Sequence, residues 1–209
     1  RRAFDLAERF RCPVFLLTDK ELNTTMTTVD VDSYEEPAVR ERAVLPAAEL
    51  PYRYLPADDV PPLAQYGGDG AVRFTGSTHD ERAIITKAPS KVAQMNEHLR
   101  AKIEDHVDEI ELVVKDMQPS ATTLLVSYGI TAGGMREAVA QIRAAGRAVS
   151  ALTLQSLWPV PEAAIRESLA GITRVVVAEL NHGQYRREIE RLANGIEVVG
   201  LHRVDGELI

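Results

Sequence analysis

The densest cluster of side chains that could do chemistry lies at residues 75–81, where His79, Asp80 and Glu81 follow one another. Imidazole and carboxylate groups can carry protons or ligate a metal ion. Three adjacent side chains rarely face one site, however, and no second cluster in the sequence would complete a coordination sphere. We therefore favour an ordered turn that hydrogen-bonds a neighbouring segment.

A glycine-rich corner is the second candidate, because Gly129 and Thr131 stand where an apolar run gives way to a helical pattern. Unpaired backbone N–H groups at a helix start attract anions. The dinucleotide-binding fingerprint differs in glycine spacing, and no acidic residue closes the next strand at Leu154. We favour a tight turn that needs glycine over a phosphate site. Any ligand contact here should come from N–H groups at residues 130–133.

The third candidate is the polar run at residues 179–184, which also follows an apolar strand pattern. The carboxyl ends of parallel strands meet at one edge of a sheet, so this run should converge with the glycine corner. His182 could carry protons there. The alternative, which we favour, is that Asn181 caps the next helix and His182 is a surface or interface residue.

Alternating apolar runs and helical patterns must position these groups. Such alternation predicts an α/β fold with a mostly parallel sheet and helices on both faces, Rossmann-like in architecture. The predicted strands span residues 122–127, 149–154, 175–178 and 196–201, and the predicted helices span residues 135–145, 184–193 and a segment that opens at Pro161.

The region before this domain has a different character. Apolar side chains at three- and four-residue spacing predict a long amphipathic helix over residues 90–118, with Ser90 as its N-cap. Prolines interrupt residues 23–89, which we interpret as an irregular arm crossing a surface. Its apolar anchors would be the aromatic residues Tyr34, Tyr52, Tyr54, Tyr66 and Phe74.

The first residues indicate a piece of a longer polypeptide, since there is no initial Met and residues 3–10 already show a helical pattern. The apolar run at residues 12–19 predicts a buried parallel strand. The sheet for that strand would lie in further sequence or in another subunit.

The composition of the chain argues against several classes of binding partner and site. A net charge of −7 argues against nucleic acid, whose phosphates need a basic surface. No apolar run approaches the roughly 20 residues of a membrane helix. The single Cys12 cannot form a disulfide within the chain or hold an iron–sulfur cluster alone, and it favours a reducing cytoplasm.

The order of these segments resembles the carboxyl-terminal part of the alpha subunit of 2-oxoacid:ferredoxin oxidoreductases, particularly the 2-oxoglutarate type. The segments that carry the resemblance are residues 7–19, 75–81, 127–132, 157–161, 179–184 and 203–209. It implies four parts, which are the end of a thiamine pyrimidine-binding domain at 1–22, the arm at 23–89, the helix at 90–118 and a transketolase carboxyl-terminal-like domain at 119–209.

The resemblance also implies a reaction, the oxidative decarboxylation of a 2-oxoacid with coenzyme A to an acyl-CoA and reduced ferredoxin. Thiamine diphosphate and iron–sulfur clusters would be held mainly by a thiamine-binding beta subunit. No catalytic residue or metal ligand carries over to this chain, whose role would be assembly with that subunit and further copies of the complex. The loop with His79, Asp80 and Glu81 would reach toward the partner. Gly129, Thr131 and Asn181 are further candidates for cofactor contacts.

Two other functions fit the same sequence. The first is the beta subunit of a 2-oxoacid dehydrogenase or a transketolase-type enzyme, which shares the last domain. The second is a nucleotide-binding regulatory module that uses the glycine corner. Gly133 and Gly134 weigh against an anion site, because relatives commonly have a basic residue and a small one there.

Overall fold

The computed structural model describes residues 2–33, 43–46, 49–54, 56–62, 64–68 and 72–209. The chain divides into two compact units. The first, which we call the arm unit, contains the residues up to Leu16 and Thr28–Glu109. The second, the α/β unit, contains Leu17–Thr27 and Ile110–Ile209. Each unit has its own packing and is described by itself.

The α/β unit is built on a five-stranded sheet in the order β1-β3-β2-β4-β5. The pairs β3–β2, β2–β4 and β4–β5 are parallel, and β1 runs antiparallel to β3 at one edge. The predicted α/β fold with a mostly parallel sheet is therefore confirmed. The strands are β1 (Val113–Asp116), β2 (Thr123–Tyr128), β3 (Ser150–Leu154), β4 (Arg174–Glu179) and β5 (Glu197–His202).

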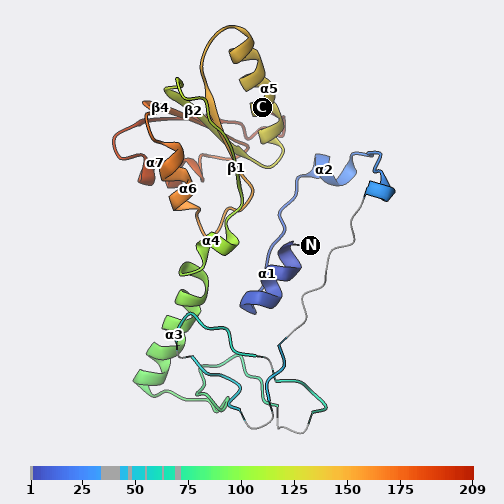
Figure 1. Ribbon diagram of the computed structural model, residues 1–209, viewed down its shortest axis with the longest axis vertical. Coiled ribbons are helices and arrows are strands. Elements are labelled where there is room, and N and C mark those ends of the chain that lie inside the picture. Colours follow the sequence, from blue (N-terminus) through green and yellow to red (C-terminus); the bar gives the residue numbers. More distant parts are fainter. Residues whose placement is uncertain (1, 34–42, 47–48, 55, 63, 69–71) are drawn as a thin grey trace. The chain divides into compact units, whose positions relative to one another are not determined.

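Helices cover both faces of this sheet, as Figure 1 shows. Successive residues of a strand point to opposite faces, so Leu124 and Val126 join one core while Leu125 joins the other. Helices α6 (Glu162–Ser168) and α7 (Arg186–Ala193) pack on the first core. Helix α5 (Thr131–Ala144) packs on the second through Met135 and Val139.

The single long helix predicted over residues 90–118 is wrong beyond its first half. Helix α3 (Pro89–Glu104) ends early, a short α4 (Val107–Ile110) follows, and the chain then enters β1. Pairing with β3 decides this conformation, because the ladder hydrogen bonds and the contact of Val113 with the core outweigh a local helical pattern. The predicted N-cap is also displaced, since Pro89 is the first helical residue and Ala88 precedes it.

The arm unit contains α1 (Arg2–Phe10), the 3-10 turn η1 (Val31–Ser33) and α3. Buried Phe10 lies against the His106 ring, with 5.6 Å between the ring centroids. Two of the predicted aromatic anchors, Tyr52 and Tyr54, lie together with 6.3 Å between ring centroids. Tyr52 also lies on His79, and Tyr54 stacks on His98 of α3. Tyr34 lies outside the described residues.

The buried strand predicted at residues 12–19 stays a prediction, because its sheet was expected in further sequence or in another subunit. These residues form no strand, and Phe15 and Leu16 are 83% and 79% exposed. A parallel strand exists only beside a partner strand, and the described part of the chain offers it none. Helix α2 (Lys20–Thr24) follows this segment at the start of the α/β unit.

Candidate functional site

The polar groups gather at the carboxyl edge of the parallel strands, between β2 and β4. Strand β2 is flanked by β3 and β4, which the chain reaches by crossovers on opposite faces of the sheet. Open α/β sheets bind ligands at this kind of switch point. The glycine corner after β2 and the polar run after β4 both lie there, as the sequence predicts.

Glu179, the last residue of β4, is the centre of the edge. Its carboxylate is fully buried and accepts hydrogen bonds from the Tyr128 hydroxyl at 2.9 Å and from the backbone N–H groups of Tyr185 and Arg186 at 3.0 Å each. The last two groups form the start of α7, whose positive end favours a carboxylate. Glu179 therefore joins the ends of two strands to the start of a helix.

Tyr128 connects this carboxylate to Asn181. The Asn181 amide donates to the Tyr128 hydroxyl at 2.7 Å, while its side-chain oxygen accepts the N–H groups of Gly183 and Gln184. Burial, followed by the hydrogen bond to Glu179, raises the pKa of Tyr128 well above its ordinary value. Asn181 thus closes the loop before α7, and the helix start itself is capped by Glu179.

His202, at the end of β5, lies over the same loop. Its Nε2 is 3.6 Å from a Glu179 carboxylate oxygen and, among the described residues, has no hydrogen-bond partner. A Cβ at Gly183 would meet the imidazole Cε1 at 2.6 Å, and one at Gly200 would overlap the ring. Glycine at both positions gives the imidazole its space. His182, by contrast, is exposed.

The glycine corner already holds a carboxylate from its own chain. Asp19 accepts the Ile130 N–H at 2.9 Å from 111 residues away, and Gly129 has a φ of +58°. The amides of Ala132 and Gly133 donate to carbonyls of the turn. Thr131 is buried in the first turn of α5. The groups that could bind an anion are thus largely engaged within the chain.

The cluster at residues 79–81 lies in the arm unit and forms an ordered turn. Asp80 accepts the backbone N–H groups of Arg82 and Ile84 at 2.9 Å, and these bonds, the one from Ile84 first, lower its pKa. The His79 ring lies against Tyr52 with 4.2 Å between centroids, and its Nδ1 is 3.0 Å from the Asp80 carbonyl oxygen.

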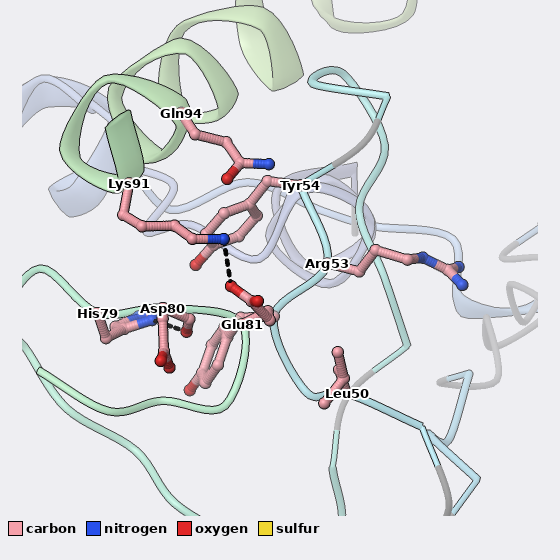
Figure 2. Close-up of a pocket in the computed structure, with 9 residues that line it drawn as sticks. Leu50, Arg53, Tyr54, His79, Asp80, Glu81, Lys91 and Gln94 are labelled. Atoms are coloured by element: carbon pink, nitrogen blue, oxygen red, sulfur yellow. Dashed lines mark hydrogen bonds and ion pairs between the residues drawn. The ribbon is translucent and has the colours of Figure 1, made fainter. Parts of the chain in front are cut away.

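Glu81 points away from its two neighbours and toward α3. Its carboxylate accepts a 2.7 Å bond from Lys91, which lowers the pKa of Glu81 (Figure 2). The pair borders a small pocket that is also lined by Tyr54 and Gln94. Burial, then the charge of Tyr52, raises the pKa of Tyr54 to about 12. The three adjacent residues make different contacts, yet all three line this one pocket, which differs from the expectation that they would not face one site.

No helix among the described residues is long and apolar enough to cross a membrane. Within the same residues, no group of three or more His, Cys, Asp or Glu side chains is arranged to hold a metal ion. The sequence pattern predicts that the segments of Tyr128 and Asn181 meet at this edge, but it predicts no role for Asp19. The signal available for Asp19 was an acidic residue at the end of an apolar run.

Known proteins are similar to this chain over nearly its whole length. The family model of pyruvate:ferredoxin oxidoreductase core domain II matches residues 121–209. Subunit KorA of 2-oxoglutarate synthase from Methanothermobacter marburgensis is 31% identical over 210 residues, covering 99% of this chain and 56% of the relative. The predicted resemblance to 2-oxoacid:ferredoxin oxidoreductase alpha subunits is confirmed. The chain spans about half the length of the KorA relative that it matches.

Two further matches to this chain are a sequence relative and a solved structure. Subunit alpha of 2-oxoacid:ferredoxin oxidoreductase 2 from Aeropyrum pernix is 29% identical over 86% of this chain and 29% of its own length. The solved 2-oxoglutarate:ferredoxin oxidoreductase from Magnetococcus marinus covers 82% of this chain and 31% of its own, with a TM-score of 0.73 and 22% identity. At that identity the structural match establishes the fold.

Proposed function

We propose that this chain is part of the alpha subunit of a 2-oxoacid:ferredoxin oxidoreductase that acts on 2-oxoglutarate. The reaction would convert the 2-oxoacid and coenzyme A to an acyl-CoA and carbon dioxide while reducing ferredoxin. The observation that carries the proposal is similarity to a 2-oxoglutarate synthase subunit over 99% of the chain. The α/β fold of residues 110–209 agrees with it.

Within the complex, we assign this chain to assembly. The edge where an α/β sheet would bind a ligand is occupied by internal contacts, with Asp19 on the glycine corner and Glu179 on the start of α7. Large apolar side chains are instead exposed, among them Phe15, Leu16 and Trp158 at 83%, 79% and 72%. Exposed aromatic anchors of this size are typical of protein interfaces. The thiamine-binding subunit and further copies of the complex are the proposed partners.

The cofactors of the complex are proposed to lie outside the residues described here. A thiamine diphosphate would need free donors for its phosphates, and the Ile130 amide at the corner donates to Asp19 instead. The corner therefore does not fit a diphosphate. The single Cys12 does not fit an iron–sulfur cluster, which takes several thiolates. When bound elsewhere in the complex, thiamine diphosphate would supply carbanion chemistry and iron–sulfur clusters would supply electron transfer.

The contact of residues 79–81 with a partner subunit stays a proposal. Glu81 and Asp80 are partly exposed beside the small pocket in the arm unit, which supports a role at a surface. The assignment of residues 1–22 to a thiamine domain and of the protein to the cytoplasm also stay predictions.

An enzyme assay tests the proposed substrate. The purified alpha subunit with its thiamine-binding partner should reduce ferredoxin when 2-oxoglutarate and coenzyme A are added together. Succinyl-CoA should accumulate in proportion to the electrons transferred. Pyruvate and 2-oxoisovalerate serve as matched substrates and should give slower reduction. Preference for either of these would contradict 2-oxoglutarate, and no reduction with any of them would contradict the enzyme class.

The nucleotide-binding alternative has less support. It depends on free N–H groups at the glycine corner, where Asp19 is already bound to Ile130. The transketolase-type and dehydrogenase beta-subunit alternatives share this domain architecture, but the relatives reported above are alpha and KorA subunits of oxidoreductases.

A further inference from the structure

Asp19 caps a helix to which it does not belong. It is the residue before α2, a position where aspartate normally accepts hydrogen bonds from the amides of its own helix. The Asp19 side chain makes no such bond to α2. Its carboxylate instead accepts the N–H of Ile130, the residue before α5, at 2.9 Å.

The start of α5 is shaped to receive this carboxylate. Helix α5 has 14 residues, no acidic side chain in its first turn and no side-chain cap from Ile130. The N-terminal end of α5 carries the positive end of the helix dipole. The Asp19 carboxylate is the negative charge hydrogen-bonded there, through the Ile130 N–H. A Cβ on Gly129 would lie 3.1 Å from the bonded carboxylate oxygen, so glycine keeps the approach open.

The rest of the segment around Asp19 is grouped with the α/β unit but, within the described residues, buries little of its own surface. Helix α2 buries none of its residues, and Leu17, Leu22 and Met26 are exposed. Its local bonds, such as Asn23 to Thr18 and to the Asp19 carbonyl, lie within the segment itself. The chain leaves this segment toward the arm unit at both ends, after Leu16 and at Thr28.

We propose that residues 17–27 are a strap, and that Asp19 fastens it to the α/β unit by capping α5 from a distant part of the same chain. Loss of the carboxylate releases the strap while the sheet stays folded. In the part of the chain that the structure describes, the hydrogen bond from Ile130 to Asp19 is the one that fastens the strap. A partner that covers or withdraws Asp19 would therefore control whether residues 17–27 stay on the α/β unit. This inference stands on the contacts of the α/β unit and does not depend on the oxidoreductase reaction.

Hydrogen exchange of the full-length alpha subunit in its complex tests the strap. Asp19→Ala should raise the exchange rate of the Ile130 amide roughly 10- to 100-fold, the range expected for losing a hydrogen bond to a charged group. Amides at residues 20–25 should exchange faster as well, and chymotrypsin should cut sooner after the exposed Leu22. Amides of β4 should keep their wild-type rates. Asp19→Asn, which keeps an acceptor oxygen but loses the charge, should give an intermediate effect.

Glu21→Gln is the matched control, because it removes one negative charge from the same strap without touching Ile130. It should leave the Ile130 amide at its wild-type exchange rate. Unchanged exchange at Ile130 in Asp19→Ala would overturn the proposal. Equal acceleration throughout β2 and β4 would overturn it too, because Asp19 would then stabilise the whole unit rather than fasten a strap.

Discussion

At the scale of single residues, the carboxyl edge of the sheet depends on one buried carboxylate. The Glu179 carboxylate accepts hydrogen bonds from three neutral donors. Each of these bonds offsets part of the free-energy cost of burying the carboxylate. Tyr128 is the one donor that a conservative substitution can remove, because the other two are backbone groups. Its hydroxyl also accepts the bond from Asn181.

Tyr128→Phe should therefore lower the free energy of unfolding by about 1.5–3 kcal/mol, since it takes a donor from a buried charge. Urea unfolding of the alpha subunit at pH 7 measures this change. Tyr66→Phe is the control, because Tyr66 is 74% exposed and its substitution should change stability by less than about 0.5 kcal/mol. Equal effects of the two substitutions would contradict the role given to Tyr128.

The free energy of unfolding of wild type and of Tyr128→Phe should also depend differently on pH. The folded-state pKa of Tyr128 is raised above its ordinary value of 10.0, so the stabilisation is complete below pH 10 and is lost as the pH rises further. Wild type should lose more stability between pH 9 and 11 than Tyr128→Phe, as urea unfolding at each pH would show.

Residue-level prediction from the sequence succeeded where topology forces residues together. The sequence placed the segments of Tyr128 and Asn181 at one edge, because the carboxyl ends of parallel strands must meet there. The partner of Asp19 was not predictable in this way. The two bonded residues are 111 positions apart, and no periodic pattern relates a loop carboxylate to the helix that it caps.

At the scale of elements, the two glycines at the start of α5 have different surroundings. A Cβ at Gly133 would have its nearest contact at 4.0 Å, with the flexible end of Arg136. A Cβ at Gly134 would lie 2.8 Å from the backbone oxygen of Ile209. Only the second glycine is required by a close approach of the backbone.

Gly133→Ala should therefore stabilise the α/β unit by about 0.5–1 kcal/mol, because alanine favours a helix and here meets open space. Gly134→Ala should give no gain or a loss, because the segment at Ile209 must move. Thermal unfolding of the two variants measures the difference. Equal stabilisation by both would show that Ile209 does not constrain α5.

Most elements of the α/β unit followed from apolar patterns, and β1 did not. The four predicted strands are confirmed within one residue at every end, since buried parallel strands are short apolar runs between helical patterns. Strand β1 continues the apolar spacing of α3, and its strand conformation depends on pairing with β3 far along the chain. The residues of β1 alone therefore do not predict that it pairs with β3.

At the scale of the whole molecule, the exposed apolar surface favours an interface with other protein. The chain exposes adjacent large apolar side chains at Phe15 and Leu16. The sequence predicted burial for these residues because it could show their apolar character but not the surface that covers them. In the proposed complex, a partner or the rest of the subunit supplies that surface.

Sedimentation velocity of the full-length alpha subunit, alone and with its thiamine-binding partner, tests this central claim most directly. We expect one faster-sedimenting species that contains both subunits when they are mixed in equal amounts. A stable alpha monomer that sediments identically in the presence of the partner would contradict the assembly role proposed for this chain.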